Sequence, residues 1–295
     1  MKAMNNEIHI PVLLNEVLEY LALSAGDTFI DATLGFGGHS QEVLKRIGTK
    51  GKLIGIEQDQ AVIEMAAQKL NGENVILVNE NFEKLDEILN SLKIKKVDKI
   101  LFDLGVSSFH FDSSGRGFSF QKDEPLDMRL SQKTSISASD LVGGLSAKEL
   151  ADLIYTLGDE SMSRQIANAI VEARRKKRIE TTGELTAVIE SVVPRRAKIN
   201  PSTKTFQALR IAVNDELNIL QKTLPIAVDH LNKNGRIAVI SFHSGEDRIV
   251  KNIFKRLKQD QKIEILTKKP LVATEDEIRE NPRSRSAKLR VAQAI

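Results

Sequence analysis

The 295-residue chain contains no cysteine. This absence excludes disulfides, thiolate-bound zinc and ordinary iron–sulfur clusters. It also excludes any mechanism that depends on a cysteine nucleophile. The five histidines include no pair with the spacing of a metal site. We therefore expect that the protein requires no metal.

The chain also lacks a long apolar run. No stretch approaches the roughly 20 apolar residues that cross a membrane, and the opening MKAMNNEIHI lacks the apolar core of a secretory signal. A composition of 41% hydrophobic and 28% charged residues is typical of a globular protein. We expect a cytoplasmic protein without a membrane partner.

The net charge is only +3, yet the basic residues are clustered. Any single cluster is typical of a solvated helix face or a turn, but three clusters favour a polyanionic partner such as nucleic acid. The clusters are RRKKR at 174–178, RRAK at 195–198 and RSRSAKLR at 283–290.

The first hundred residues alternate between strand-like and helix-like patterns. Strands are expected at 27–32, 51–57, 74–82 and 97–105, with helices between them. This alternation predicts a parallel sheet covered on both faces. Ligands of such sheets bind at the carboxyl ends of the strands. The residues at or just after those ends are Asp31, Glu57, Phe82 and Asp103.

The alternation then stops until a fifth strand at 235–242. Capping-box patterns at 146–149 and 181–184 indicate helices in between. We predict a sheet domain at 1–108 and 205–295, and an inserted helical domain at 109–204. The return is expected to contain one long helix at 205–220, a helix at 245–258 and final strands at 262–266 and 287–293.

The glycine-rich segment DATLGFGGHS, residues 31–40, follows the first strand. Ser40 stands where the dinucleotide fingerprint has its third glycine, so the match to that fingerprint is incomplete. Glu57, or failing it Asp59, occupies the place of a ribose-hydroxyl acceptor. The pattern indicates an adenosine-type ligand without choosing between NAD and S-adenosylmethionine. The alternative is a tight strand–helix turn with no ligand.

Longer strings resemble one family along almost the whole chain, from about residue 9 to residue 292. They are HIPVLLNEVLEYL, DATLGFGGHS, DLGVSS, RGFSF, PLDMRL, TFQALRIAVNDEL, VISFHSGEDRIVK and NPRSRSAKLR. Together they resemble the RsmH (MraW) family, bacterial small-subunit ribosomal RNA methyltransferases that act on cytidine N4.

The resemblance implies an α/β fold: a Rossmann-like class I methyltransferase sheet with an inserted all-α domain that recognises substrate. It implies S-adenosylmethionine as methyl donor and small-subunit ribosomal RNA as partner, with a decoding-region cytidine in an assembled subunit as target. The positions that it assigns to the donor are Gly37, Gly38, His39, Glu57, Phe82, Asp103 and His110.

The sequence departs from the family pattern at a few of these positions. Glu57 replaces the usual aspartate, and Phe109-His110 replaces Pro-Gln. Asn200 stands where a histidine is typical, and Gly245 where leucine is common.

The chemistry that the resemblance implies needs alignment and an acceptor. Cytosine N4 is a poor nucleophile, and a group that accepts its N–H would raise its reactivity. Asp103 and His243 are the candidate catalytic residues. The alternatives are that Asp103 only binds the donor and that His243 only stabilises the end of the fifth strand. Cytosine C5 methylation needs a cysteine, so direct transfer to nitrogen or oxygen remains.

Aromatic and basic residues could contact the RNA. Phe109, Phe111, Phe118 and Phe120, with Arg116 among them, are either a stacking surface for the target nucleotide or core residues of the insert. In the insert, Arg174, Arg175 and Lys176 are expected to contact phosphates.

Two other functions stay open from the sequence. A nicotinamide-dependent oxidoreductase would use the same sheet and Glu57, but it would want the third glycine and a proton relay. A non-catalytic ribosome-assembly factor would retain the pocket only as a vestige.

Overall fold

The computed structural model describes residues 10–194 and 200–295, and these residues form two compact units. The first unit contains the chain up to Gly105 and from Leu217 onward, and the second is Val106–Glu216. The basic segment at 195–198 and His9 lie outside the described residues.

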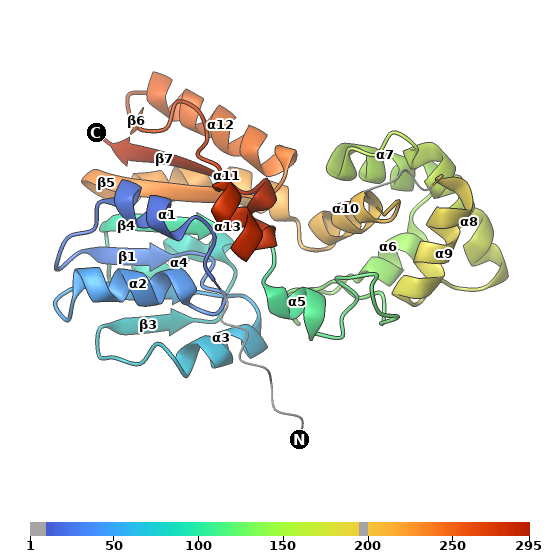
Figure 1. Cartoon of the computed structure of the whole chain (residues 1–295), viewed down its shortest axis with the longest axis horizontal. Helices are drawn as coiled ribbons and strands as arrows, with labels where there is room; N and C mark the ends of the chain where they lie inside the picture. Colours follow the sequence, from blue (N-terminus) through green and yellow to red (C-terminus); the bar gives the residue numbers. More distant parts are fainter. Residues whose placement is uncertain (1–9, 195–199) are drawn as a thin grey trace. The chain divides into compact units, whose positions relative to one another are not determined.

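The first unit is a seven-stranded sheet in the order β3-β2-β1-β4-β5-β7-β6 with helices on both faces (Figure 1). Its parallel strands are β1 (Thr28–Asp31), β2 (Lys52–Ile56), β3 (Val75–Val78), β4 (Val97–Asp103) and β5 (Leu231–Ser241). The last two strands, β6 (Ile263–Ile265) and β7 (Lys288–Ala294), pair antiparallel. The mixed α/β class expected from the sequence is therefore confirmed.

Two apolar cores cover the two faces of this sheet, because successive strand residues point to opposite sides. Ile30, Ile54 and Ile100 point into one core, and their chain neighbours Phe29 and Leu53 into the other. The first core is closed by α4 (Leu85–Ser91), α11 (Glu216–Asp229) and α12 (Ser244–Gln259). The second is closed by α1 (Leu14–Leu21), α2 (Gly38–Ile47) and α3 (Gln60–Ala67).

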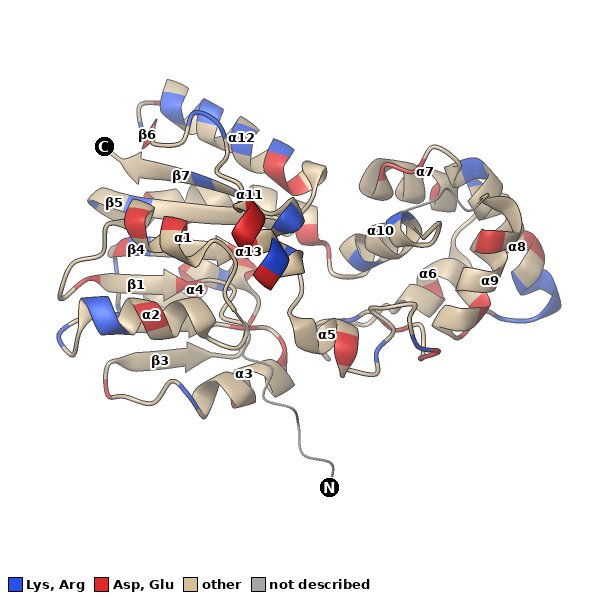
Figure 2. Cartoon of the chain, in the orientation of Figure 1, with Lys and Arg blue, Asp and Glu red and all other residues tan. Residues whose placement is uncertain are grey.

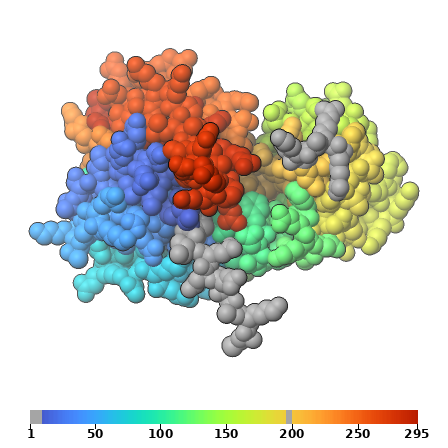
Figure 3. Space-filling view, in the orientation of Figure 1, coloured from blue at the N-terminus to red at the C-terminus, as the bar shows by residue number. Residues whose placement is uncertain are grey.

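A segment near the start of the described chain lies beside one near its end in the first unit. The later segment contains α13 (Glu275–Glu280) and η2 (Pro282–Ser286), which precede β7. Elsewhere in this unit, the 3-10 helix η1 (Phe82–Lys84) precedes α4. A carboxylate oxygen of Glu277 accepts the Leu13 N–H at 2.7 Å, and the Asn281 amide donates to the Ile10 carbonyl at 3.0 Å. The red segment therefore lies against the blue one in Figure 3.

The second unit is helical and has a core of its own, centred on residues such as Leu150, Ile154 and Ile166. Its helices are α5 (Ser108–Asp112), α6 (Ala138–Gly144), α7 (Ala147–Gly158), α8 (Ser163–Lys176), α9 (Thr182–Val192) and α10 (Thr203–Val213). The predicted capping boxes are present: Ser146 caps α7 and Thr181 caps α9. The unit also includes α10, whereas the boundary predicted from the sequence assigns residues from 205 onward to the sheet domain.

One predicted element is wrong. The single helix expected at 205–220 is two helices, α10 and α11, separated by Asn214 and Asp215. Asp215 has a left-handed φ of 49°, which stops the helix. The Asn214 side chain is committed to Leu130 and Met128, far away in the sequence.

Candidate functional site

Three acidic residues share the carboxyl edge of the sheet. Asp31 ends β1, Asp103 ends β4, and Glu57 follows β2 directly. Because β1 pairs in parallel with both β2 and β4, these ends meet at the same edge. This is the edge where open α/β sheets bind ligands.

Asp31 is buried, and its carboxylate is held by the glycine loop. The Ser40 hydroxyl donates to one oxygen at 2.7 Å, and the Thr33 N–H donates to the other at 3.3 Å. Burial raises the pKa of Asp31 to about 6, against the lowering effect of these hydrogen bonds. Ser40, where the dinucleotide fingerprint has glycine, thus uses its hydroxyl to hold the first strand-end acid.

Glu57 holds the glycine loop and the start of α3. One carboxylate oxygen accepts the Gly35 N–H at 3.0 Å, and the other accepts the Asp59 N–H at 2.9 Å. Burial raises the pKa of Glu57 to about 7, and the nearby Asp59 and Asp31 charges add to the shift. A carboxylate oxygen has more than one lone pair, so each can accept a further hydrogen bond. Asp59, the fallback acceptor, instead caps α3 through the Ala61 N–H.

The loop requires glycine at two positions for different reasons. Gly37 has a φ of 76°, and a Cβ there would lie 2.5 Å from Leu70 Cδ1. At Gly38, the first residue of α2, a Cβ would lie 2.7 Å from Pro11 Cγ. The backbone therefore fits closely between these side chains.

His39 and Asp103 face each other at the exit of this loop. His39 Nε2 lies 2.9 Å from the Val12 carbonyl oxygen, which can only accept, so this nitrogen carries the proton. His39 Nδ1 then points to Asp103 Oδ2 at 3.6 Å. The His39 ring is thereby fixed in orientation.

Among the described residues, Asp103 Oδ1 has no hydrogen-bond partner although that atom is buried. Its backbone N–H donates to Thr33 Oγ1 at 2.6 Å, which fixes the strand end. Burial raises the pKa of Asp103 well above its usual value, and the charges of Asp31 and Glu246 raise it further. A buried oxygen without a partner is costly in a structural role and suits a group that bonds a ligand.

Phe82 begins η1, beyond the end of β3. Its ring packs edge-on against Phe102, with the centroids 5.4 Å apart, and it is partly buried. Phe82 therefore presents a fixed aromatic surface rather than a flexible side chain.

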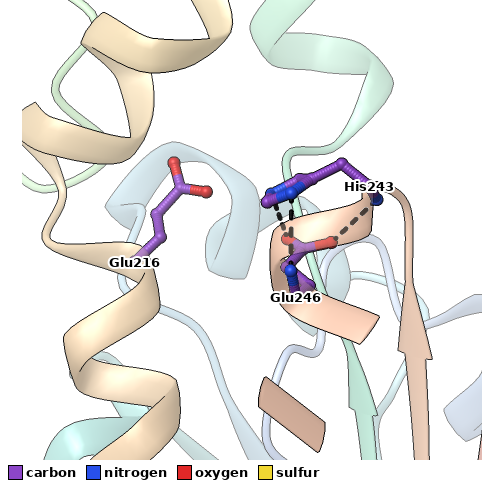
Figure 4. A group of neighbouring side chains, drawn as sticks. All are labelled: Glu216, His243 and Glu246. Carbon is purple, nitrogen blue, oxygen red and sulfur yellow. Dashed lines mark hydrogen bonds and ion pairs between the residues drawn. The ribbon is translucent and has the colours of Figure 1, made fainter. Parts of the chain in front are cut away.

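His243 caps α12, as Figure 4 shows together with Glu246. Its Nδ1 accepts the Glu246 N–H at 3.4 Å, and its Nε2 lies 3.2 Å from Glu246 Oε1. The other Glu246 oxygen accepts the Phe242 N–H at 2.7 Å. This arrangement agrees with the alternative in which His243 stabilises the strand end.

His110 belongs to the second unit, where it closes the capping box of α5. Its Nδ1 accepts from the Ser107 N–H at 3.1 Å, and its ring packs against Phe109 and Phe118. These contacts all lie within the second unit.

The aromatic group after β4 contributes in part to the core of the second unit. Phe118 is buried, and Phe120 packs edge-on against Phe206 at 5.2 Å. The Arg116 guanidinium donates to the Arg129 carbonyl at 3.0 Å and lies over the Phe118 ring.

The basic run at 174–178 has acidic partners at several positions. Arg175 pairs with Glu172, Lys177 with Glu184, and Arg178 with Asp140 and Glu180. Arg174 donates to the Val142 carbonyl. Lys176 is exposed, and within the described part of the chain it has no ion pair.

A family model described as the MraW methylase family matches residues 6–295. The chain belongs to this family. One relative, a ribosomal RNA small subunit methyltransferase H of Persephonella marina, is 49% identical, covering 97% of this chain and 99% of its own. The protein of the same name from Dictyoglomus thermophilum is 48% identical, covering 97% and 96%.

Membership in the MraW methylase family confirms the resemblance seen in the sequence. The alternative of a nicotinamide-dependent oxidoreductase has no support from it. Across the described residues, no helix is long and apolar enough to span a bilayer.

Two residues of this candidate site do not follow from the sequence patterns described above. In the sequence, Ser40 only marks the absence of the third glycine, whereas in the structure its hydroxyl donates a hydrogen bond to Asp31. Glu246 is the second such residue: it is buried, its N–H donates to His243 Nδ1, and its carboxylate accepts the His243 N–H. The signal was present: a glutamate three residues after a capping residue is the capping-box spacing, here with histidine in place of serine or threonine.

Proposed function

We propose that this protein transfers a methyl group from S-adenosylmethionine to the N4 amino group of a cytidine in small-subunit ribosomal RNA. We propose a decoding-region cytidine of an assembled small subunit as the target. Family membership and the names of the relatives support the reaction class. The observation that carries the site is the set of strand-end carboxylates beside the glycine loop. Asp103 Oδ1 is buried there and has no hydrogen-bond partner in residues 10–194 and 200–295.

The residues of the first unit fit such a donor. Gly37 and Gly38 leave the loop backbone bare, and His39 is fixed beside it. Glu57 has spare acceptor capacity for ribose hydroxyls, and Phe82 offers an aromatic face to an adenine. S-adenosylmethionine, when bound, supplies a methyl group that its sulfonium has already activated. The chain therefore has to bind, orient and accept a hydrogen bond.

Asp103 is the acceptor that we assign to the target amino group. The carboxylate oxygen Oδ1 can accept a hydrogen bond from an N–H of the amino group. This bond makes the lone pair of the amino nitrogen more available for attack on the methyl group. Its raised pKa suits it to receive the proton that the amine loses. His243 caps α12 through Nδ1, so we favour Asp103, which ends β4 beside the glycine loop. No cysteine is available for a covalent adduct, which supports direct in-line transfer.

We assign substrate recognition to the helical segment 109–204, with Arg116, Arg174, Arg175 and Lys176 as candidate RNA contacts and His110 as a candidate donor contact. We also propose that no metal is required. Methyl transfer that survives treatment with a chelator such as EDTA supports this point, and activity that returns only with an added divalent cation contradicts it.

The product identifies the reaction. Small subunits that lack the modification are incubated with the protein and methyl-labelled S-adenosylmethionine, and the RNA is digested to nucleosides for mass spectrometry. We expect label in N4-methylcytidine at one position. Label in another nucleoside, or none at all, rejects the proposal. Naked RNA and isolated large subunits serve as parallel substrates.

Asp103→Asn separates the two roles open to Asp103. If Asp103 is the acceptor, kcat of the Asp103→Asn variant should be roughly 100- to 10,000-fold lower than that of the wild type, because the amide cannot take up the proton. The dissociation constant of S-adenosylmethionine, measured by calorimetry, should change only a few-fold. A large loss of donor affinity with kcat maintained at saturating donor would instead make Asp103 a donor-binding residue.

A further inference from the structure

The exposed side of α12 is strongly basic, a feature that the sequence clusters did not include. Five residues form what we call the α12 basic face: Arg248, Lys251, Lys255, Arg256 and Lys258. All five are exposed. Figure 2 shows the blue segments following one another along α12.

The rotation of α12 is fixed by its other side. Val250, Ile253, Phe254 and Leu257 are buried in the core against the sheet. Helix positions three or four apart lie on the same side, so this apolar stripe directs the α12 basic face to solvent. The other exposed residues of α12, which are Ser244, Asn252 and Gln259, are uncharged.

Within α12 itself no acid lies among these cations; the exposed Asp260 follows the helix directly as its C-cap. The acids of α12 lie in its first turn: Glu246 is buried, and Asp247 binds Arg290 at 2.6 Å. Within the described ranges, no member of the α12 basic face has an ion pair. The run at 174–178, by contrast, has acidic partners at several positions. Of these two basic groups, the α12 basic face thus has more cations without an ion-pair partner in the described residues.

We propose that the α12 basic face binds phosphates of the substrate RNA. This inference rests on the proposed function, because it takes RNA as the substrate. Cations about 5 Å apart along a helix side provide a row of phosphate contacts, and each contact releases counterions from the RNA. The α12 basic face therefore supplies affinity that does not depend on base sequence.

The test uses a triple variant, Arg248→Gln, Lys251→Gln and Lys255→Gln. These positions precede the last turn of α12. The variant therefore keeps Arg256 and Lys258, whose positive charges stabilise the carboxyl end of the helix through its dipole. The matched control is Lys50→Gln, Lys52→Gln and Lys95→Gln, which removes the same charge at the amino ends of the strands. Binding of small-subunit RNA is measured over a series of salt concentrations, with donor binding and thermal stability measured alongside.

We expect the triple variant to reduce the slope of log affinity against log salt by about two to three, with weaker RNA binding at low salt. The control should keep the wild-type slope. The charge-conserving variant Arg248→Lys, Lys251→Arg and Lys255→Arg should also keep the wild-type slope. If the wild type and the triple variant have equal slopes and equal affinities for the RNA, the proposal for the α12 basic face is overturned. In that case, methylation of the RNA by the wild type still supports the proposed function. A wild type that neither binds nor methylates the RNA rejects the proposed function itself.

Discussion

At the scale of single residues, Asp31 shows how the fold sets the pH response of the site. Its pKa rises from 3.8 to about 6 because burial disfavours the charged form. Between these pH values the folded state binds more protons than the unfolded state. The free energy of unfolding therefore falls as pH rises through this window. The stabilisation that Asp31 contributes to the folded state is fully present below about pH 4 and is lost above about pH 6. It is on the order of 3 kcal/mol.

Asp31→Asn cannot titrate, so its unfolding free energy should vary less between pH 4 and pH 6 than that of the wild type. Denaturant titrations at pH 4, 5, 6 and 7 measure this difference. Glu57, whose pKa rises to about 7, should extend the residual slope to higher pH. Equal slopes in the two proteins would show that Asp31 is not the group responsible.

Gly37 is the residue at which the loop conformation is most demanding. Gly37→Ala places a Cβ 2.5 Å from Leu70 Cδ1 and keeps a φ of 76° that alanine disfavours. We expect it to lower the free energy of unfolding by about 2–4 kcal/mol, from backbone strain and crowding together. In a Leu70→Ala background the cost should fall to about 1–2 kcal/mol, since only the strain remains. A double-mutant cycle by denaturant unfolding gives this coupling, and purely additive effects would contradict the contact.

At the scale of elements, Asn214 connects the end of α10 to a distant loop. Its Oδ1 accepts the Leu130 N–H at 2.9 Å, and its Nδ2 donates to the Met128 carbonyl at 2.8 Å. Met128 has a left-handed φ of 62° and is fully buried, so the loop depends on these bonds.

Asn214→Ala should lower the free energy of unfolding of the second unit by about 2–4 kcal/mol, because it leaves two buried backbone groups without partners. Asn214→Asp keeps an acceptor at every pH. At low pH the protonated carboxyl can also donate to Met128, so its cost should be smaller than that of the alanine variant. At neutral pH the carboxylate cannot donate, so the cost should rise. Denaturant unfolding gives both values. A cost below 1 kcal/mol for the alanine variant would mean that water replaces the side chain.

These elements show which features were predictable. The strands were predictable because their apolar runs are local, and the strand-end acids followed from the rule that parallel strands share a carboxyl edge. The break between α10 and α11 was not, since Asn214 is defined by partners more than 80 residues away. The partner of His39, the Val12 carbonyl, was hidden for the same reason. Local patterns therefore identified the acids, while the contacts that orient them required the fold.

At the scale of the whole molecule, the apolar cores are divided between the units. The sheet unit is held by the cores on its two faces, and the helical unit by residues such as Ile166. A core substitution should therefore weaken mainly the unit that contains it.

Ile166→Ala tests this division, because the side chain is fully buried in α8. It should cost the helical unit about 2–5 kcal/mol. Hydrogen exchange should accelerate in α7, α8, α9 and α10, while β1, β2 and β4 keep their protection. Leu53→Ala, which opens a cavity under β2, should give the reverse pattern. Equal acceleration across both units in either variant would show that they unfold as one cooperative body.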